Sequence, residues 1–185
     1  MYTTKFITSD NELRQIAELS RLNSAESITD DVKAEQGYVS WKYTFDDLKA
    51  LHEITPSAII KDGDKVIGYL LVLVMESATV YPPLKDALKL FDGQYYKGKL
   101  LMDYKVYFLG QTCIDSNYRG KGLLRKLYQF HKDNFESVYD FALSSIARDN
   151  PKSMIVHAKL GFRTLFPFSD GEKDWDIVIW DFNLG

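Results

Sequence analysis

Apolar residues recur along the first part of the chain with two different periods, which predict strands and helices. Alternation over residues 2–8 predicts a strand. Spacings of three and four follow Ser9 or Asp10 and again follow Thr44, and these side chains can cap the first turn of a helix. Apolar runs at 57–60 and 65–75 flank an Asp-Gly pair at 62–63, which predicts two buried strands joined by a tight turn.

The order of elements is clearest from residue 105 onward. The pattern predicts a strand at 106–114, a turn at 115–121, a helix at 123–135, a strand at 141–146, a helix at 151–160, a strand at 162–166, a turn at 169–173 and a strand at 175–182. Asn150 before Pro151 is typical of a helix start, and Gly161 of a helix end. The fold class predicted is a mixed α/β sheet with helices on both faces.

Residues 77–103 follow neither period well. Pro82-Pro83 can start a short helix that ends at Asp92-Gly93, and residues 95–99 are predicted to be loop. Two interpretations stay open for this segment. It is either an insertion that faces a substrate, as loops on a rigid scaffold often do, or a plain cover for a sheet edge or an apolar face.

Composition narrows the class of protein. The chain has 185 residues, which predicts one domain over 1–185, and its net charge of −3 argues against nucleic-acid or anionic-membrane partners. The longest apolar run, 67–75, is far shorter than the ~20 residues that cross a bilayer. One cysteine, Cys113, excludes an internal disulfide, and with three histidines it argues against a zinc site. We therefore expect a cytoplasmic protein without a metal.

Candidate chemistry concentrates where the strand at 106–114 turns into the helix at 123–135. Free N–H groups at a helix start carry partial positive charge and form an anion site. Gly120 and Gly122 let a phosphate approach the backbone closely, and Arg119, Lys121 and Arg125 add donors. Neither the Walker nor the Rossmann glycine spacing is present. Taken alone, Arg-Gly-Lys-Gly is also typical of a solvated turn.

A second motif follows this loop, in which Asn150 is followed by His157 and then by Lys-Leu-Gly-Phe at 159–162. Together with YRGKGLLRKLY at 118–128, it resembles the GNAT superfamily of acyl-CoA-dependent N-acetyltransferases, in a bacterial branch that brings no substrate with it. The family's cofactor loop reads [Q/R]-x-x-G-x-[G/A]. The resemblance is specific over 106–166. It implies a GNAT-like fold, with a mostly antiparallel sheet splayed at the cofactor site, and acetyl-CoA as cofactor with coenzyme A as product.

The resemblance also implies roles for individual residues. Backbone groups of two residues at the end of the first strand would contact the pantetheine arm and thioester, and the glycine loop would wrap the pyrophosphate. The implied cofactor-binding residues are Cys113, Ile114, Arg119, Gly120, Lys121, Gly122, Leu123, Leu124, Arg125 and Asn150. Leu124 departs from the family pattern by placing bulk where glycine or alanine is usual. The Cys113 side chain is expected to be a small buried filler.

His157 is the implied catalytic residue, because it takes the place of the tyrosine that protonates the departing thiolate. Its free pKa is about 6.5 against about 10 for tyrosine, so acid, base, hydrogen-bond donor and inert helical residue all stay open. Some relatives carry a glutamate base where Ser145 stands. Glu76, Asp103 and Asp115 lie near strand ends, and the sequence selects none of them.

The predicted function is transfer of an acetyl group to a primary amine of a small molecule or protein, by direct attack in a ternary complex. The departures at 124, 145 and 157 leave open a non-catalytic acyl-CoA-binding or interaction module. The predicted partner is the amine acceptor, and the resemblance permits a homodimer. The other two histidines, His52 and His131, are assigned to helix surfaces without chemistry.

Overall fold

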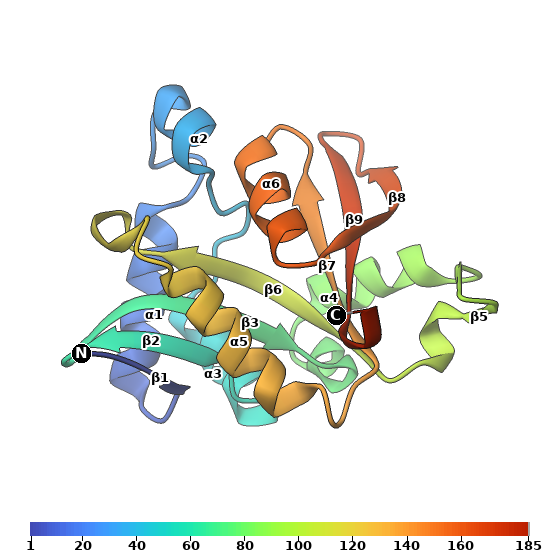
Figure 1. Cartoon of the computed structure of the whole chain (residues 1–185), viewed down its shortest axis with the longest axis horizontal. Helices are drawn as coiled ribbons and strands as arrows, with labels where there is room; N and C mark the ends of the chain where they lie inside the picture. Colours follow the sequence, from blue (N-terminus) through green and yellow to red (C-terminus); the bar gives the residue numbers. More distant parts are fainter. Residues whose placement is uncertain (185) are drawn as a thin grey trace.

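A seven-stranded sheet runs through the molecule in the order β1-β2-β3-β6-β7-β9-β8 (Figure 1). The computed structural model describes residues 1–184. Its strands are β1 (Tyr2–Phe6), β2 (Ala58–Asp62), β3 (Lys65–Leu73), β4 (Tyr95–Tyr96), β5 (Lys99–Leu100), β6 (Val106–Ile114), β7 (Phe141–Ala147), β8 (Arg163–Ser169) and β9 (Asp174–Asp181). Its α-helices are α1 (Asp10–Leu22), α2 (Asp30–Gln36), α3 (Phe45–Ile54), α4 (Pro82–Leu88), α5 (Leu123–Phe135) and α6 (Pro151–Lys159).

The centre of this sheet is split. Neighbouring strands are antiparallel except β6 and β7, which run parallel and pair only over Val106–Phe108 and Phe141–Leu143. Beyond that point β6 stays with β3 while β7 stays with β9, so the two strands diverge. The predicted fold class, a mostly antiparallel sheet that splays open, is confirmed.

A bulge in β6 lies at the start of the split. The register between β3 and β6 shifts at Leu71/Val72, where Gly110 is the extra residue. A Cβ on Gly110 would lie 2.5 Å from Leu73 Cδ1 and 2.9 Å from the Tyr43 hydroxyl. Only glycine fits there, because the neighbours are packed side chains of the core.

Alternate residues of the strands feed two separate cores. Tyr69 and Leu71 belong to the core under α1 and α3, whereas Leu70 and Val72 belong to the core under α5. In Figure 1, α5 crosses one face of the sheet, and α1 and α3 lie against the other. Burial on both faces explains why β3 and β6 read as continuous apolar runs rather than alternating ones.

Three predictions from the sequence need correction. Helix α2 was not predicted, because none of its residues is buried and no apolar period marks it. Residues 95–99, predicted to be loop, contain β4 and the first residue of β5, which form a short hairpin. His131, assigned to a helix surface, is fully buried. Its Nε2 pairs with the Tyr107 hydroxyl at 2.6 Å, and burial lowers its pKa to about 3.

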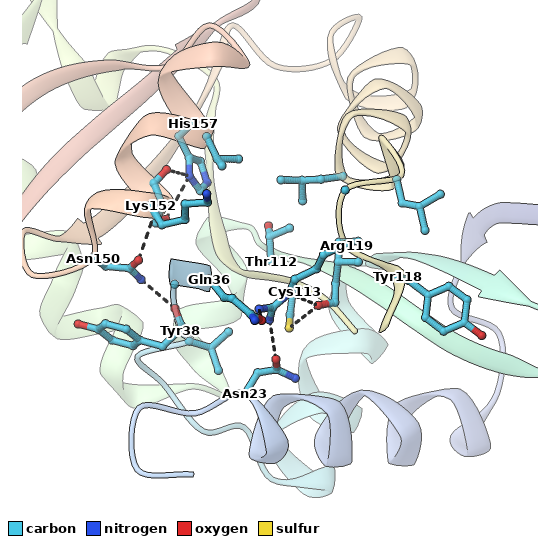
Figure 2. Close-up of a pocket in the computed structure, with 18 of the residues that line it drawn as sticks. Asn23, Gln36, Tyr38, Thr112, Cys113, Tyr118, Arg119, Asn150, Lys152 and His157 are labelled. Carbon is cyan, nitrogen blue, oxygen red and sulfur yellow. Dashed lines mark hydrogen bonds between the residues drawn. The ribbon is translucent and has the colours of Figure 1, made fainter. Parts of the chain in front are cut away.

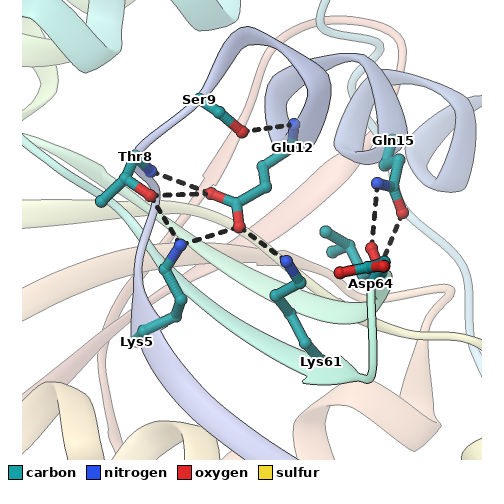
Figure 3. A network of polar contacts seen from close by, with 8 residues as sticks. Lys5, Thr8, Ser9, Glu12, Gln15, Lys61 and Asp64 are labelled. Carbon is teal, nitrogen blue, oxygen red and sulfur yellow. Dashed lines mark hydrogen bonds and ion pairs between the residues drawn. The ribbon is translucent and has the colours of Figure 1, made fainter.

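The N-terminal strand and first helix are joined to β2 by one buried carboxylate (Figure 3). Glu12 on α1 accepts hydrogen bonds from the backbone N–H of Thr8 at 2.9 Å, from Lys5 at 2.8 Å and from Lys61 at 2.9 Å. Burial of the carboxyl group raises its pKa, but these donors outweigh burial and hold the pKa at about 2, against 4.5 for a free glutamate. The network therefore stabilises the fold only while Glu12 is ionised.

We expect Glu12→Gln to destabilise the protein by about 3 kcal/mol at pH 7, because about 1.4 kcal/mol corresponds to each unit between 4.5 and about 2. Since the folded pKa is the lower one, this stabilisation is present above 4.5 and is lost as pH falls toward 2. Urea unfolding at pH 7 and at pH 3 measures it. Glu18→Gln, on the exposed side of the same helix, is the matched control and should leave the midpoint nearly unchanged. Equal losses for both variants at pH 7 would contradict the assignment.

Candidate functional site

A cleft of about 270 Å³ opens where β6 leaves β7 (Figure 2). It is bounded by the end of β6, the loop at 115–122, the start of α5, the face of α6 and residues 36–39. Two cationic side chains, Arg119 and Lys152, line it, and none of its lining residues is a carboxylate. The charge of the cleft therefore favours an anionic ligand.

The loop between β6 and α5 presents backbone N–H groups to this cleft. Gly122 adopts a left-handed conformation as the N-cap of α5, and no side chain caps the helix. The first N–H groups of α5 therefore have no helical acceptor and carry partial positive charge. Gly120 and Gly122 have φ values of 75° and 73°, and a Cβ on either would meet nothing within 4 Å among the residues described. This is open space beside an anion-binding helix start.

Three residues predicted on this loop differ in where their side chains lie. Arg119 donates to Asn23 Oδ1 at 2.7 Å, to the Ile114 carbonyl at 3.1 Å and to Gln36. The Arg119 guanidinium thus joins this loop to Asn23 and Gln36 in the cleft wall. Lys121 and Arg125 are exposed and do not line the cleft.

The backbone of β6 has a free edge along the split, and the register decides which residues offer it. Cys113 lies opposite Tyr69, and Asp115 N–H donates to the Ile67 carbonyl at 2.8 Å. Because backbone groups alternate between the two sides of a strand, Cys113 turns its N–H and C=O toward β3. Those of Thr112 and Ile114 face the opening, where the Ile114 carbonyl already accepts from Arg119 Nε at 3.1 Å. The buried Cys113 thiol, whose pKa burial raises to about 12, stays neutral.

Asn150 has both side-chain groups engaged. Its Oδ1 accepts from Ser153 N–H at 3.3 Å and so caps α6, while its Nδ2 donates to the Tyr38 carbonyl at 2.9 Å. The second bond holds residues 37–43, a segment that we call the strap. At the other end of the strap, Gln111 Nε2 donates to the Trp41 carbonyl at 2.6 Å. Asn150 therefore fixes the wall of the cleft as well as the start of a helix.

His157 is the last residue of a hydrogen-bonded chain that starts at Thr112 in the cleft. Its Nδ1 is 2.8 Å from the Ser153 carbonyl, which only accepts, so Nδ1 carries the proton. Its Nε2 must then accept from the Tyr128 hydroxyl at 2.9 Å, and Tyr128 in turn accepts from Thr112 Oγ1 at 3.1 Å. Burial lowers the pKa of His157, although the bond to Ser153 partly opposes this. The chain thus runs from Thr112 in the cleft through the buried Tyr128 hydroxyl to His157, which itself lines the cleft.

The other residues singled out from the sequence differ in whether they line the cleft. Leu124 is half-buried against the α5 core and also lines the cleft. Ser145 is exposed and lines a narrow passage of about 70 Å³ through the split, which we define by Leu109, Gly110, Ser144 and Ser145. Glu76, Asp103 and Asp115 line neither the cleft nor the passage, and Asp115 forms an ion pair with Lys65 at 2.7 Å.

Sequence reasoning missed Thr112, Tyr128, Lys152 and the strap as parts of this site. Thr112 could have been found from the alternation of β6, once the outer side of the strand was known. Tyr128 recurs with the apolar residues of α5, and nothing in that spacing indicates a role for its hydroxyl. The strap has no periodic signal, because its place depends on bonds to Gln111 and Asn150.

Comparisons with known proteins agree with this geometry. The profile of the Acetyltransferase (GNAT) family matches residues 18–162, and the chain belongs to this family. A sequence comparison with curated proteins finds no significant match. The residues described contain no helix long and apolar enough to cross a membrane. Within the same residues, no cluster of three or more histidine, cysteine or acidic side chains is arranged to hold a metal.

Solved structures with the same fold share little sequence with the chain. The ribosomal-protein-S18-alanine N-acetyltransferase from Escherichia coli is 13% identical with a TM-score of 0.60, over 98% of this chain and 94% of that one. YncA, a putative acetyltransferase from Salmonella typhimurium solved with acetyl-CoA, is 15% identical with a TM-score of 0.61, over 98% and 94%. NAA60 from Arabidopsis thaliana, solved with acetyl-CoA, is 12% identical with a TM-score of 0.63, over 98% and 99%.

The two bonds of Asn150 can be separated by substitution. Asn150→Asp keeps an oxygen that caps α6 but replaces the donor to Tyr38 with a second acceptor, whereas Asn150→Ala loses both bonds. We expect the alanine variant to be about 1–2 kcal/mol less stable than the wild type from loss of the cap alone. Both variants should show faster proteolysis within residues 37–43, measured by limited digestion with mass spectrometry. Protection of the strap in Asn150→Asp at the wild-type level would show that the Tyr38 bond does not hold it.

Proposed function

We propose that the chain is an acetyl-CoA-dependent N-acetyltransferase that acetylates a primary amine of a small molecule or protein by direct attack in a ternary complex. The observation that carries this proposal is the split between β6 and β7, which lies beside the uncapped start of α5. The split exposes strand backbone, and the helix start exposes N–H groups. A thioester arm and a pyrophosphate need these two kinds of partner at adjoining places.

The residues divide between the two ends of such a ligand. Backbone N–H groups of residues 120–125 suit the pyrophosphate, and Lys152 adds a cation on the opposite wall. The outward backbone groups of Thr112 and the N–H of Ile114, in place of the groups of Cys113, suit the pantetheine amides. The Ile114 carbonyl is already bound by Arg119. Arg119 and Asn150 act by holding the walls. Acetyl-CoA, when bound, supplies an acyl group activated as a thioester.

The transfer balances without any further reactant. An ammonium acceptor loses one proton to solvent, and the amine nitrogen forms a bond to the thioester carbonyl carbon. The carbon–sulfur bond breaks, sulfur leaves with the electron pair, and the nitrogen loses a second proton. Sulfur takes up one proton, so the net products are the amide, coenzyme A and one released proton. Holding both reactants in one site lowers the barrier by positioning.

The hydrogen-bond chain behind the cleft has a direction that suits the second of these protons. Thr112 lines both the cleft and the passage, so its hydroxyl faces the place where the nitrogen would react. It can accept a proton while passing its own to Tyr128, which passes one to His157 Nε2. His157 therefore acts as a proton acceptor. His157 is not assigned as the acid for the thiolate. The one N–H hydrogen of its neutral ring is on Nδ1, which donates to the Ser153 carbonyl.

A second candidate function has its own observation. Within the described part of the chain, no carboxylate lines the passage, so a strong base is missing at the reacting position. This favours a module that binds acyl-CoA without turnover. We propose that the chain works as one domain in either case. We also propose a cytoplasmic location, which fits a chain whose single cysteine is free and buried.

We expect Gly122→Glu to abolish acetyl-CoA binding, since it places a carboxylate and a strained backbone at the helix start. Isothermal titration with acetyl-CoA and with coenzyme A measures the affinity. Gly63→Glu is the matched control, because Gly63 also has a positive φ with open space around it but lies in the β2–β3 turn. Wild-type affinity in Gly122→Glu would remove the cofactor from this loop. Binding without coenzyme A release across an amine panel would favour the second candidate function.

We expect Tyr128→Phe and His157→Ala each to lower kcat about 10- to 100-fold with little change in the acetyl-CoA KM, because either breaks the relay. The double variant should lose no more than the worse single variant. Because the pKa of His157 is lowered, wild-type activity should show no histidine inflection near pH 6.5. Multiplicative losses in the double variant would mean that the two residues do not act as one chain.

A further inference from the structure

The passage through the split leads to a second cavity on the other side, which we call the chamber. The chamber holds about 350 Å³, within the range of about 300–1,000 Å³ usual for small-molecule sites. It shares Leu109, Gly110, Ser144 and Ser145 with the passage, so the two spaces adjoin. The passage in turn shares Thr112 and His157 with the cleft. The three spaces therefore lie in a row, each sharing part of its wall with the next.

The walls of the chamber are apolar and aromatic. Trp41 and Tyr43 come from the strap, Tyr81 and Phe91 from the segment at 77–103, and Phe168 and Trp175 from the β8–β9 hairpin. Trp41 is 48% exposed, which is unusual for so large an apolar side chain and leaves part of it free for contact. The segment at 77–103 thus lines a cavity and also covers an apolar face, because Leu84, Phe91 and Leu101 belong to the core under α1 and α3.

The charge of the chamber has one sign. Its lining contains no lysine, arginine or histidine, and its two acidic residues are Asp86 and Asp170. Asp170 accepts from Trp175 Nε1 at 2.8 Å, and Trp175 also lines the passage. Asp86 is ion-paired with Lys89 at 2.7 Å, whereas Asp170 has no cation partner among the residues described and also accepts from the backbone N–H groups of Glu172 and Lys173. Asp170 is therefore the carboxylate that is fixed in the chamber wall beside Trp175. A cationic head would be attracted here, whereas a carboxylate on the ligand would be repelled.

We propose that the chamber is the acceptor site and that it takes a small primary amine on an apolar, aromatic body without a carboxylate. The inference rests on the proposed function and names its substrate class. The aromatic body lies among Trp41, Tyr81 and Phe91, and the amine faces Ser144, Ser145 and the passage. The volume of about 350 Å³ suits a small molecule.

The test compares 2-phenylethylamine, phenylalanine and spermidine as acceptors, which differ by the added carboxylate or by the loss of the aromatic body. We expect kcat/KM for 2-phenylethylamine to exceed both others at least tenfold. Binding of the same three compounds is followed by tryptophan fluorescence in the presence of coenzyme A, so the chamber is tested without turnover. Trp41→Phe should remove most of the fluorescence change.

Ala87→Arg places a cation and added bulk in the chamber from α4. It should abolish both binding and acetylation of 2-phenylethylamine while acetyl-CoA affinity and melting temperature stay at wild-type values. Ala158→Arg is the matched control, because Ala158 is an exposed helical alanine outside the lining of the cleft, the passage and the chamber. If Ala87→Arg fails to fold, Tyr81→Ala serves instead, with a smaller loss expected.

The outcomes separate this inference from the proposed function. Acetyl-CoA binding and turnover of spermidine or phenylalanine at least as fast as 2-phenylethylamine would overturn the acceptor class and leave the acetyltransferase standing. Binding of 2-phenylethylamine that Ala87→Arg abolishes, without any turnover, would support the chamber and contradict the enzyme. No change in 2-phenylethylamine binding on Ala87→Arg would overturn the chamber as its site.

Discussion

The short parallel pairing of β6 and β7 is the constraint on which the rest of the structure depends. Three paired residues on each strand fix the angle between the two halves of the sheet, and everything beyond them is forced apart. Each half then keeps its own antiparallel partners, so the loss of further β6–β7 bonds costs the fold little. The split leaves strand backbone without a protein partner in the centre of a sheet, where such groups are otherwise paired. Ligand binding can satisfy them.

The strap and the loop before α5 turn this split into an enclosed site. Asn150 and Gln111 hold the strap by its backbone carbonyls, and the buried side chains of Val39 and Tyr43 pack in the core under α1 and α3. Arg119 holds the loop against α1 and the end of α2 in a similar way. Polar side chains that the sequence suggested for ligand contact thus serve largely to place backbone. The backbone, through N–H groups and carbonyls, is what the cleft presents.

The sequence predicted the elements whose burial is periodic and failed where burial is absent or where position depends on distant bonds. Strand β6 and helix α5 were predicted with their observed limits, because both combine apolar patterning with clear end signals. Helix α2 buries nothing and left no pattern. The glycine loop was predicted from its own residues, but the engagement of Arg119 and His157 was not. Their partners lie on α1, α2 and α5, and no spacing in the chain reports such contacts.

The strap borders the cleft, the passage and the chamber, so its position affects the shape of all three. Tyr38 and Val39 line the cleft and the passage, Trp41 lines the passage and the chamber, and Tyr43 lines the chamber. A molecule in the cleft that shifts or stiffens the strap changes the shape of the chamber. Thermodynamic reciprocity then requires that a molecule in the chamber alter affinity in the cleft by the same factor. A strap that moves with either ligand would therefore couple the two sites through heterotropic cooperativity.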